Sequence, residues 1–128
     1  MPDDSKDATT VLVVEDDFDL CDALVPILEY EGHRVVSAAN GREALDRLQA
    51  MPPPSVILLD LMMPVMDGWQ FREEQLHDPK LAGIPVVIVS GQGLLMRQAP
   101  AHGVSEVLRK PLELRDLLTA VERHVHSP

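Results

Sequence analysis

The chain has 128 residues and a mass of 14.2 kDa, the size of one average domain. Aromatic residues make up 3% of it, so a core must be built from aliphatic side chains and methionine. The one cysteine, Cys21, excludes an intramolecular disulfide and a cysteine-based zinc site, and we expect a packed thiol there. The formal net charge of −10 repels phosphate backbones and anionic lipids, so we expect neither direct nucleic-acid binding nor membrane binding.

The two ends of the chain carry few structural signals. Residues 1–9 are acidic and polar, unlike a signal peptide, and are expected to form a disordered leader. A single domain is expected over residues 10–126, with no output domain after it. No apolar run approaches the roughly 20 residues that span a bilayer. These features together indicate a cytoplasmic protein.

Strand and helix patterns alternate along the chain. In order, they are a strand at Val11–Val14, a helix at Asp19–Tyr30, a strand at Val35–Ala38, a helix after an Asn40–Glu43 capping box, a strand at Val56–Leu59, a helix at Trp69–Leu76, a strand at Val86–Val89, a helix at Gln92–Ala101, a strand at Val107–Leu108 and a helix at Leu114–Val125. The three strongest strands are continuously apolar, which is typical of parallel strands covered on both faces. Five β–α units predict a doubly wound α/β sandwich.

Polar residues follow four of the five predicted strands. The first strand leads into Glu15, Asp16 and Asp17, the third into Asp60, the fourth into Ser90, and the fifth into Arg109 and Lys110. Because the carboxyl ends of parallel strands share one edge, these side chains are expected to form one site.

The acidic residues at this edge suggest a metal and phosphoryl chemistry. Several carboxylates at one edge repel one another, and a hard divalent ion such as Mg²⁺ offsets that charge. Aspartyl-phosphate formation is a known form of covalent catalysis, and phosphoryl transfer needs a metal, a lysine and a hydroxyl donor in such an arrangement.

The motifs VLVVEDD, ILLDLMMPVMDG, PVVIVSG and VLRKPL, in this order, resemble the receiver domain of two-component response regulators (CheY-like) over residues 10–125. The resemblance implies a flavodoxin-like sheet of five parallel strands in the order 2-1-3-4-5 with five helices. It also implies a phosphoacceptor role for Asp60, direct metal ligation by Asp16, ligation through water by Glu15, and a metal-binding backbone carbonyl at Met62. Ser90 and Lys110 resemble the hydroxyl and the lysine that contact the phosphoryl group, and the Lys110–Pro111 bond is implied to be cis.

Some residues have plainer interpretations. Asp17 falls one place beyond the acidic pair, and Asp67–Gly68 is expected to be only a turn at the start of a helix. All five histidines, namely His33, His77, His102, His124 and His126, are expected at the surface. Met62 and Met63 are expected to fill the turn and the core rather than bind a cofactor.

The chain departs from the family pattern at Val107, where such domains usually carry an aromatic residue three places before the lysine. A reorienting aromatic ring therefore cannot report phosphorylation there. Gly91, Gly93 and Pro100 predict a short or mobile helix between the fourth and fifth strands.

The resemblance implies a phosphorylated switch rather than a turnover enzyme. A histidine kinase or histidine phosphotransfer protein would donate the phosphoryl group, Mg²⁺ would be the cofactor, and an unknown downstream protein would read the switched face. Two alternatives remain at this point. One is a receiver fold that docks partners without phosphorylation. The other is a metal-dependent phosphatase, although Met62 stands where such enzymes commonly place a second, acidic aspartate.

Overall fold

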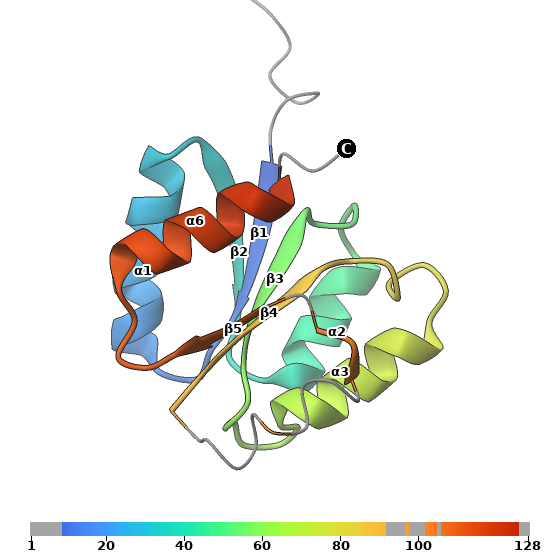
Figure 1. Cartoon of the computed structure of the whole chain (residues 1–128). Helices are drawn as coiled ribbons and strands as arrows, with labels where there is room; N and C mark the ends of the chain where they lie inside the picture. The colour runs from blue at the N-terminus through green and yellow to red at the C-terminus, as the bar shows by residue number, and fades with distance from the viewer. Residues whose placement is uncertain (1–8, 92–96, 98–101, 105, 126–128) are drawn as a thin grey trace, which may run out of the picture.

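The computed structural model describes residues 9–91, 97, 102–104 and 106–125. Its strands form one parallel sheet in the order β2-β1-β3-β4-β5, as expected (Figure 1). The strands are β1 (Thr9–Val14), β2 (His33–Ala38), β3 (Val56–Asp60), β4 (Val86–Ser90) and β5 (Glu106–Arg109). Each of the five includes the predicted segment, and β1 begins at Thr9, the last residue assigned to the leader.

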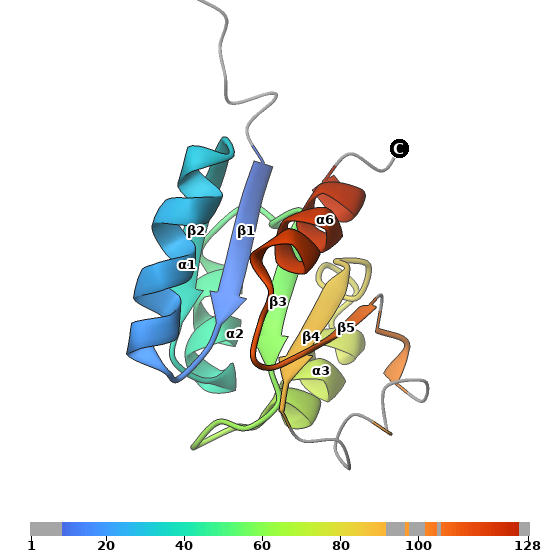
Figure 2. The same cartoon turned by 60° about the vertical axis from the view of Figure 1, so that its left-hand side comes forward.

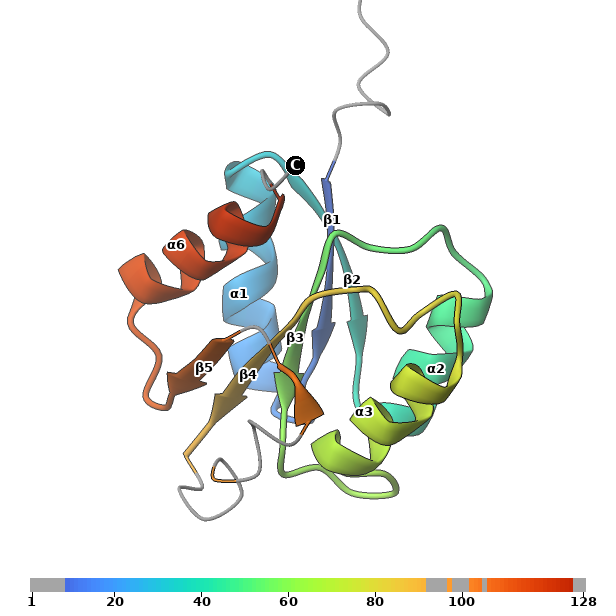
Figure 3. The ribbon, with the colours of Figure 1, turned by 45° about the vertical axis from the view of Figure 1, so that its right-hand side comes forward.

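Helices cover both faces of this sheet. Figure 3 shows α1 (Phe18–Tyr30) and α6 (Leu114–Val125) on one face, and α2 (Gly41–Gln49) and α3 (Gly68–His77) on the other. These are the four helices of the described residues. The fifth expected helix, Gln92–Ala101, lies outside them except for Arg97. None of the four is long and apolar enough to cross a bilayer.

The core has two layers because strand side chains alternate between the faces of the sheet. Leu12, Ile57 and Ile88 pack with apolar residues of α2 and α3, whereas Val13 and Leu58 pack with those of α1 and α6. All residues of β3 and β4 are buried, whereas β5, at the edge of the sheet, alternates between half-buried and exposed positions. The thiol of Cys21 lies in the second layer, as expected, and burial raises its pKa.

Three side chains cap the helices that follow the strands. Asp17 caps α1, and Asn40 caps α2 by accepting from the Glu43 amide. Glu43 returns its side chain to the amide of Ala39, one residue earlier than the predicted capping box requires. A complete capping box lies at α3, where Asp67 and Gln70 exchange side-chain and backbone bonds of 2.9 Å. Each cap satisfies helix amides that have no partner within the helix.

The prediction that all five histidines lie at the surface is wrong for His33, which is 6% exposed. Its imidazole bonds the Thr9 hydroxyl across β1 and β2, and its other ring nitrogen lies 3.3 Å from Glu122 of α6. A histidine that opens a strand beside a covering helix is buried by packing that the local sequence does not reveal. His102 and His124 are half-buried and His77 is exposed, whereas His126 lies outside the described residues.

Candidate functional site

The carboxyl ends of the strands meet at one edge of the sheet. Figure 2 shows the arrowheads of β1 and β3 pointing to the same, lower edge. The register places Val14 beside Leu59 and Asp60 beside Val89, so Asp60 lies at the level where β1 leads into Glu15. Ser90 of β4 pairs with Arg109 of β5 at the same level. The ends of β1, β3, β4 and β5 therefore lie together at this edge.

Three carboxylates form the centre of the site. Glu15, Asp16 and Asp60 each offer an oxygen within 4.8 Å of the others. Glu15 and Asp60 are buried, at 4% and 5% exposure, whereas Asp16 is exposed. Two buried carboxylates and one facing solvent make a site that a cation can enter from one side.

Lys110 supplies the positive charge at this cluster. Its Nζ lies 3.0 Å from Glu15 Oε1 and 3.5 Å from Asp60 Oδ2, and its side chain is 28% exposed. The Lys110 amide donates to the carbonyl of Ser90, 3.1 Å away, which ties the residue to the end of β4. The Lys110–Pro111 bond is cis, as expected. Ser90 is buried at the same edge, at 1% exposure.

The electrostatics of the site follow from burial and like charges. Burial raises the pKa of Glu15 to about 7; Asp60 also raises it, while the bond to Lys110 lowers it. For Lys110, burial acts to lower the pKa, but the contacts with Glu15 and Asp60 outweigh it and raise the pKa. One ammonium therefore does not fully offset the carboxylates. A divalent cation of oxygen-ligand preference fits this donor set.

The loop after β3 holds Asp60 in place. The Met62 amide lies 3.3 Å from Asp60 Oδ1 and donates to it. The side chain of Met62 is exposed, whereas Met63 packs partly against the core, so the core-filling expectation is confirmed for Met63 alone. A pocket of about 540 Å³ opens beside this loop and is lined by Asp16, Met62, Met63, Pro64 and Asp67.

The same loop contains a strained turn at Val65. Its φ is 69°, a left-handed value that is a genuine outlier for a β-branched residue. The Met66 amide donates to the Pro64 carbonyl at 2.7 Å and closes a γ-turn around it. Met66 also accepts from the Gly41 amide, so the turn is fixed to the start of α2.

Replacing Val65 by glycine is expected to stabilise the protein by about 1 kcal/mol, because glycine takes a positive φ without a steric cost. The side chain is 81% exposed, so its removal loses little packing. Val65→Ala is the matched control, since it shortens the side chain but keeps the Cβ. Urea unfolding at one Mg²⁺ concentration compares the proteins. If the glycine variant were no more stable than the alanine variant, the positive φ of Val65 would not be a source of strain.

Two of the predicted polar residues stay outside the cluster. Asp17 accepts from the amides of Asp19 and Leu20 and caps α1. Arg109 is exposed at the end of β5. Each of them is a polar residue adjacent in sequence to a residue of the cluster. The position of a residue after a strand does not by itself show which of two neighbouring polar side chains enters the site.

Gly68 starts α3 and also lies in close contact with the backbone of the site. The Asp67–Gly68 turn does start α3, as expected, but a Cβ on Gly68 would lie 2.7 Å from the Asp60 carbonyl oxygen and 2.8 Å from Leu61 Cα. The Gly68 amide donates to the Leu61 carbonyl at 3.0 Å. Only a residue without a side chain lets α3 begin directly against the backbone that carries Asp60.

The chain is similar to known proteins over nearly its whole length. The family profile of the response regulator receiver domain matches residues 11–122. The response regulator receiver protein CpdR of Brucella abortus is 35% identical over 116 residues, covering 88% of this chain and 93% of the relative. The C4-dicarboxylate transport transcriptional regulatory protein DctD of Pseudomonas aeruginosa is 35% identical over 117 residues, covering 90% of this chain and 25% of the relative. A crystal structure of a putative response regulator from Chloroflexus aurantiacus superimposes with a TM-score of 0.86 at 25% identity, covering 94% of this chain and 99% of that one.

Proposed function

Because the chain belongs to the response regulator receiver domain family, we propose that it accepts a phosphoryl group on Asp60 from a histidine kinase or a histidine phosphotransfer protein. Receiver domains are signalling switches, not enzymes that turn over a substrate. The observation that carries the proposal is the Lys110 ammonium lying within 3.0 Å of Glu15 and 3.5 Å of Asp60 at a buried carboxylate cluster.

The proposed step is attack by an Asp60 carboxylate oxygen on the phosphorus of a phosphohistidine. The new bond is an acyl phosphate P–O bond, the P–N bond breaks, and its electron pair leaves with the imidazole, which takes up a proton. Asp60 Oδ1 accepts from the Met62 amide, and Asp60 Oδ2 faces Lys110. These contacts hold the carboxylate in one orientation, which lowers the entropic part of the barrier.

Lys110 and Ser90 are proposed to receive the phosphoryl oxygens. An ammonium and a hydroxyl placed in advance beside developing charge stabilise it without reorganisation. The buried position of Ser90 and the bond from the Lys110 amide to its carbonyl keep the two residues together. The same groups would assist hydrolysis of the acyl phosphate, in which water attacks phosphorus and releases Asp60.

The metal proposed for this site is Mg²⁺. Asp16 and Asp60 would hold it directly, Glu15 through water, and the Met62 carbonyl would complete the protein ligands. The fit rests on a carboxylate cluster that one lysine does not neutralise and on the raised pKa of Glu15. When bound, such an ion neutralises the charge that builds up during phosphoryl transfer.

Phosphorylation is proposed to switch a protein-interaction face that includes β5, α6 and the expected helix at Gln92–Ala101, because Ser90 and Lys110 lead into these segments. That expected helix lies outside the described residues except for Arg97. We propose a cytoplasmic protein whose domain spans residues 10–126. The absence of direct nucleic-acid binding stays a prediction. DctD is by its name a transcriptional regulatory protein, but this chain spans only a quarter of its length.

Asp60→Asn is expected to abolish phosphorylation, because the amide cannot form the acyl phosphate. The chain is treated with acetyl phosphate and Mg²⁺ and run on a gel that retards phosphoproteins. Asp67→Asn is the matched control, since it removes one carboxylate from the same loop and asparagine caps a helix as well as aspartate does. The native chain and the control should show one retarded band. An equal band from Asp60→Asn would overturn the assignment, and no band from any of them would favour a docking module that works without phosphorylation.

A further inference from the structure

A buried polar stripe runs along α3. Trp69, Arg72 and Gln75 follow one another at intervals of three residues and are 7%, 5% and 0% exposed. Residues at this spacing lie on one side of a helix. A buried guanidinium and a buried amide are costly unless their hydrogen bonds are made, so their partners identify what this side of α3 holds.

Arg72 holds the backbone that leads into β5. Its Nε donates to the His102 carbonyl at 2.9 Å, and one terminal nitrogen donates to the Gly103 carbonyl at 3.0 Å. The other terminal nitrogen donates at 2.8 Å to Gln75, whose own amide donates to the carbonyls of Leu81 and Ile84 before β4. These bonds connect α3 to the segments that precede both β4 and β5.

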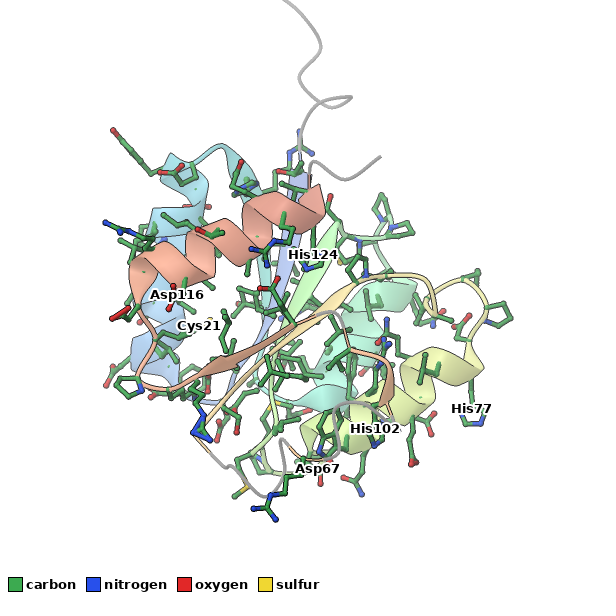
Figure 4. The ribbon with its side chains drawn as sticks, in the orientation of Figure 1. Cys21, Asp67, His77, His102, Asp116 and His124 are labelled. Atoms are coloured by element: carbon green, nitrogen blue, oxygen red, sulfur yellow. The ribbon has the colours of Figure 1, made fainter. Side chains whose placement is uncertain are left out.

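A ring stack adds to this attachment. The rings of Trp69 and His102 lie 4.3 Å apart between centroids with their planes at 15°. In Figure 4, His102 lies against α3, in agreement with its stack on Trp69. Val104 packs partly against the same core layer as Trp69. Residues 102–104 are therefore held to α3 by two hydrogen bonds, a stacked ring pair and apolar packing.

The start of α3 lies directly against Asp60, the proposed phosphoacceptor. Gly68, the first residue of α3, bonds the Leu61 carbonyl and leaves no room for a Cβ against the Asp60 carbonyl. The Asp67–Gln70 capping box fixes the first turn. A helix of ten residues, seated on Asp60 at its start and on residues 102–103 within its first two turns, is a short and stiff connection between the two.

We infer that α3 acts as a lever: phosphorylation of Asp60 displaces α3, and α3 in turn moves residues 102–104, which precede β5. Trp69 and Arg72 are the positioning residues that attach this segment to the helix. This inference rests on the proposed function. Packed elements change by discrete shifts of whole elements rather than by continuous deformation, so a displacement of the Asp60 loop that moves α3 also moves residues 102–104. Val107 on β5 has a small side chain that is 37% exposed, so no aromatic ring at this position can transmit phosphorylation by reorienting.

Hydrogen exchange with a phosphate mimic tests the lever. Amide exchange of residues 102–109 is measured with Mg²⁺ alone and with Mg²⁺ plus beryllofluoride, while the fluorescence of Trp69, the one tryptophan of the chain, reports binding. In the native chain, the mimic is expected to change exchange there at least twofold. Arg72→Met is expected to bind the mimic with an affinity within threefold of native, yet to lose at least half of that exchange change. Arg115→Met, an exposed arginine of α6, is the matched control and should behave as the native chain.

Each outcome decides a different statement. An Arg72→Met protein that binds the mimic and keeps the full exchange change overturns the lever and leaves the proposed function intact. A native chain that does not bind the mimic overturns both. If Arg72→Met does not fold, His102→Ala removes only a half-buried ring from the stack, and the same loss of the exchange change is expected from it. A full change in His102→Ala would then overturn the lever.

Discussion

Lys110→Met is expected to slow phosphorylation of Asp60 by acetyl phosphate about 100-fold, the typical cost of removing one group that stabilises charge in the transition state. Methionine keeps most of the length of the side chain and removes the ammonium that lies 3.5 Å from Asp60 Oδ2. The rate is measured from timed samples on a gel that retards phosphoproteins, at saturating Mg²⁺.

Mg²⁺ binding separates this effect from general damage to the site. The Lys110 ammonium also pairs with the carboxylates that would hold the metal, and it lies 3.0 Å from Glu15 Oε1. Its removal leaves the cluster more negative, so calorimetric titration should show Mg²⁺ affinity rising rather than falling. Arg109→Met removes a neighbouring exposed charge and should change neither quantity. A Lys110→Met rate within threefold of native would contradict the proposed role of the ammonium.

The fold and the centre of the site could be predicted because both depend on local patterns and one topological rule. Continuous β-branched runs indicate strands buried on both faces, and β3 and β4 are buried throughout. Parallel strands bring their carboxyl ends to one edge, which places Asp16, Asp60 and Lys110 together although they are far apart in sequence. Neither inference needs detailed knowledge of loops.

The parts that escaped prediction depend on hydrogen-bond partners that lie outside the helix or strand concerned. On α3, an apolar pattern would bury Leu76 and expose Arg72 and Gln75, yet Leu76 is 42% exposed and both polar residues are buried. Their burial is tolerated because carbonyls of residues 81, 84, 102 and 103 accept their hydrogen bonds. No periodicity in the sequence shows where those carbonyls will lie. His33 escaped for the same reason, since its neighbours come from β1 and α6.

Gly68→Ala is expected to destabilise the protein by about 2–3 kcal/mol, near the upper end of what overpacking costs. The added Cβ would meet the Asp60 carbonyl oxygen at 2.7 Å and Leu61 Cα at 2.8 Å. Both are backbone atoms at the end of a fully buried strand, so neither can retreat alone. Either α3 shifts away and loses the bond from the Gly68 amide to Leu61, or the backbone of Asp60 moves.

The second route displaces Asp60, the proposed phosphoacceptor, and the first releases the Leu61 carbonyl beside it. The same variant should therefore be phosphorylated at least about tenfold more slowly, because small misplacements of reacting groups carry large rate costs. Gly83→Ala is the matched control: a Cβ there meets nothing within 4 Å, and stability and phosphorylation should stay close to native. Urea unfolding and timed phosphorylation compare the three proteins. A Gly68→Ala protein as stable and as quickly phosphorylated as the control would mean that α3 can move off Asp60 freely. In that case the helix could not carry a signal away from it.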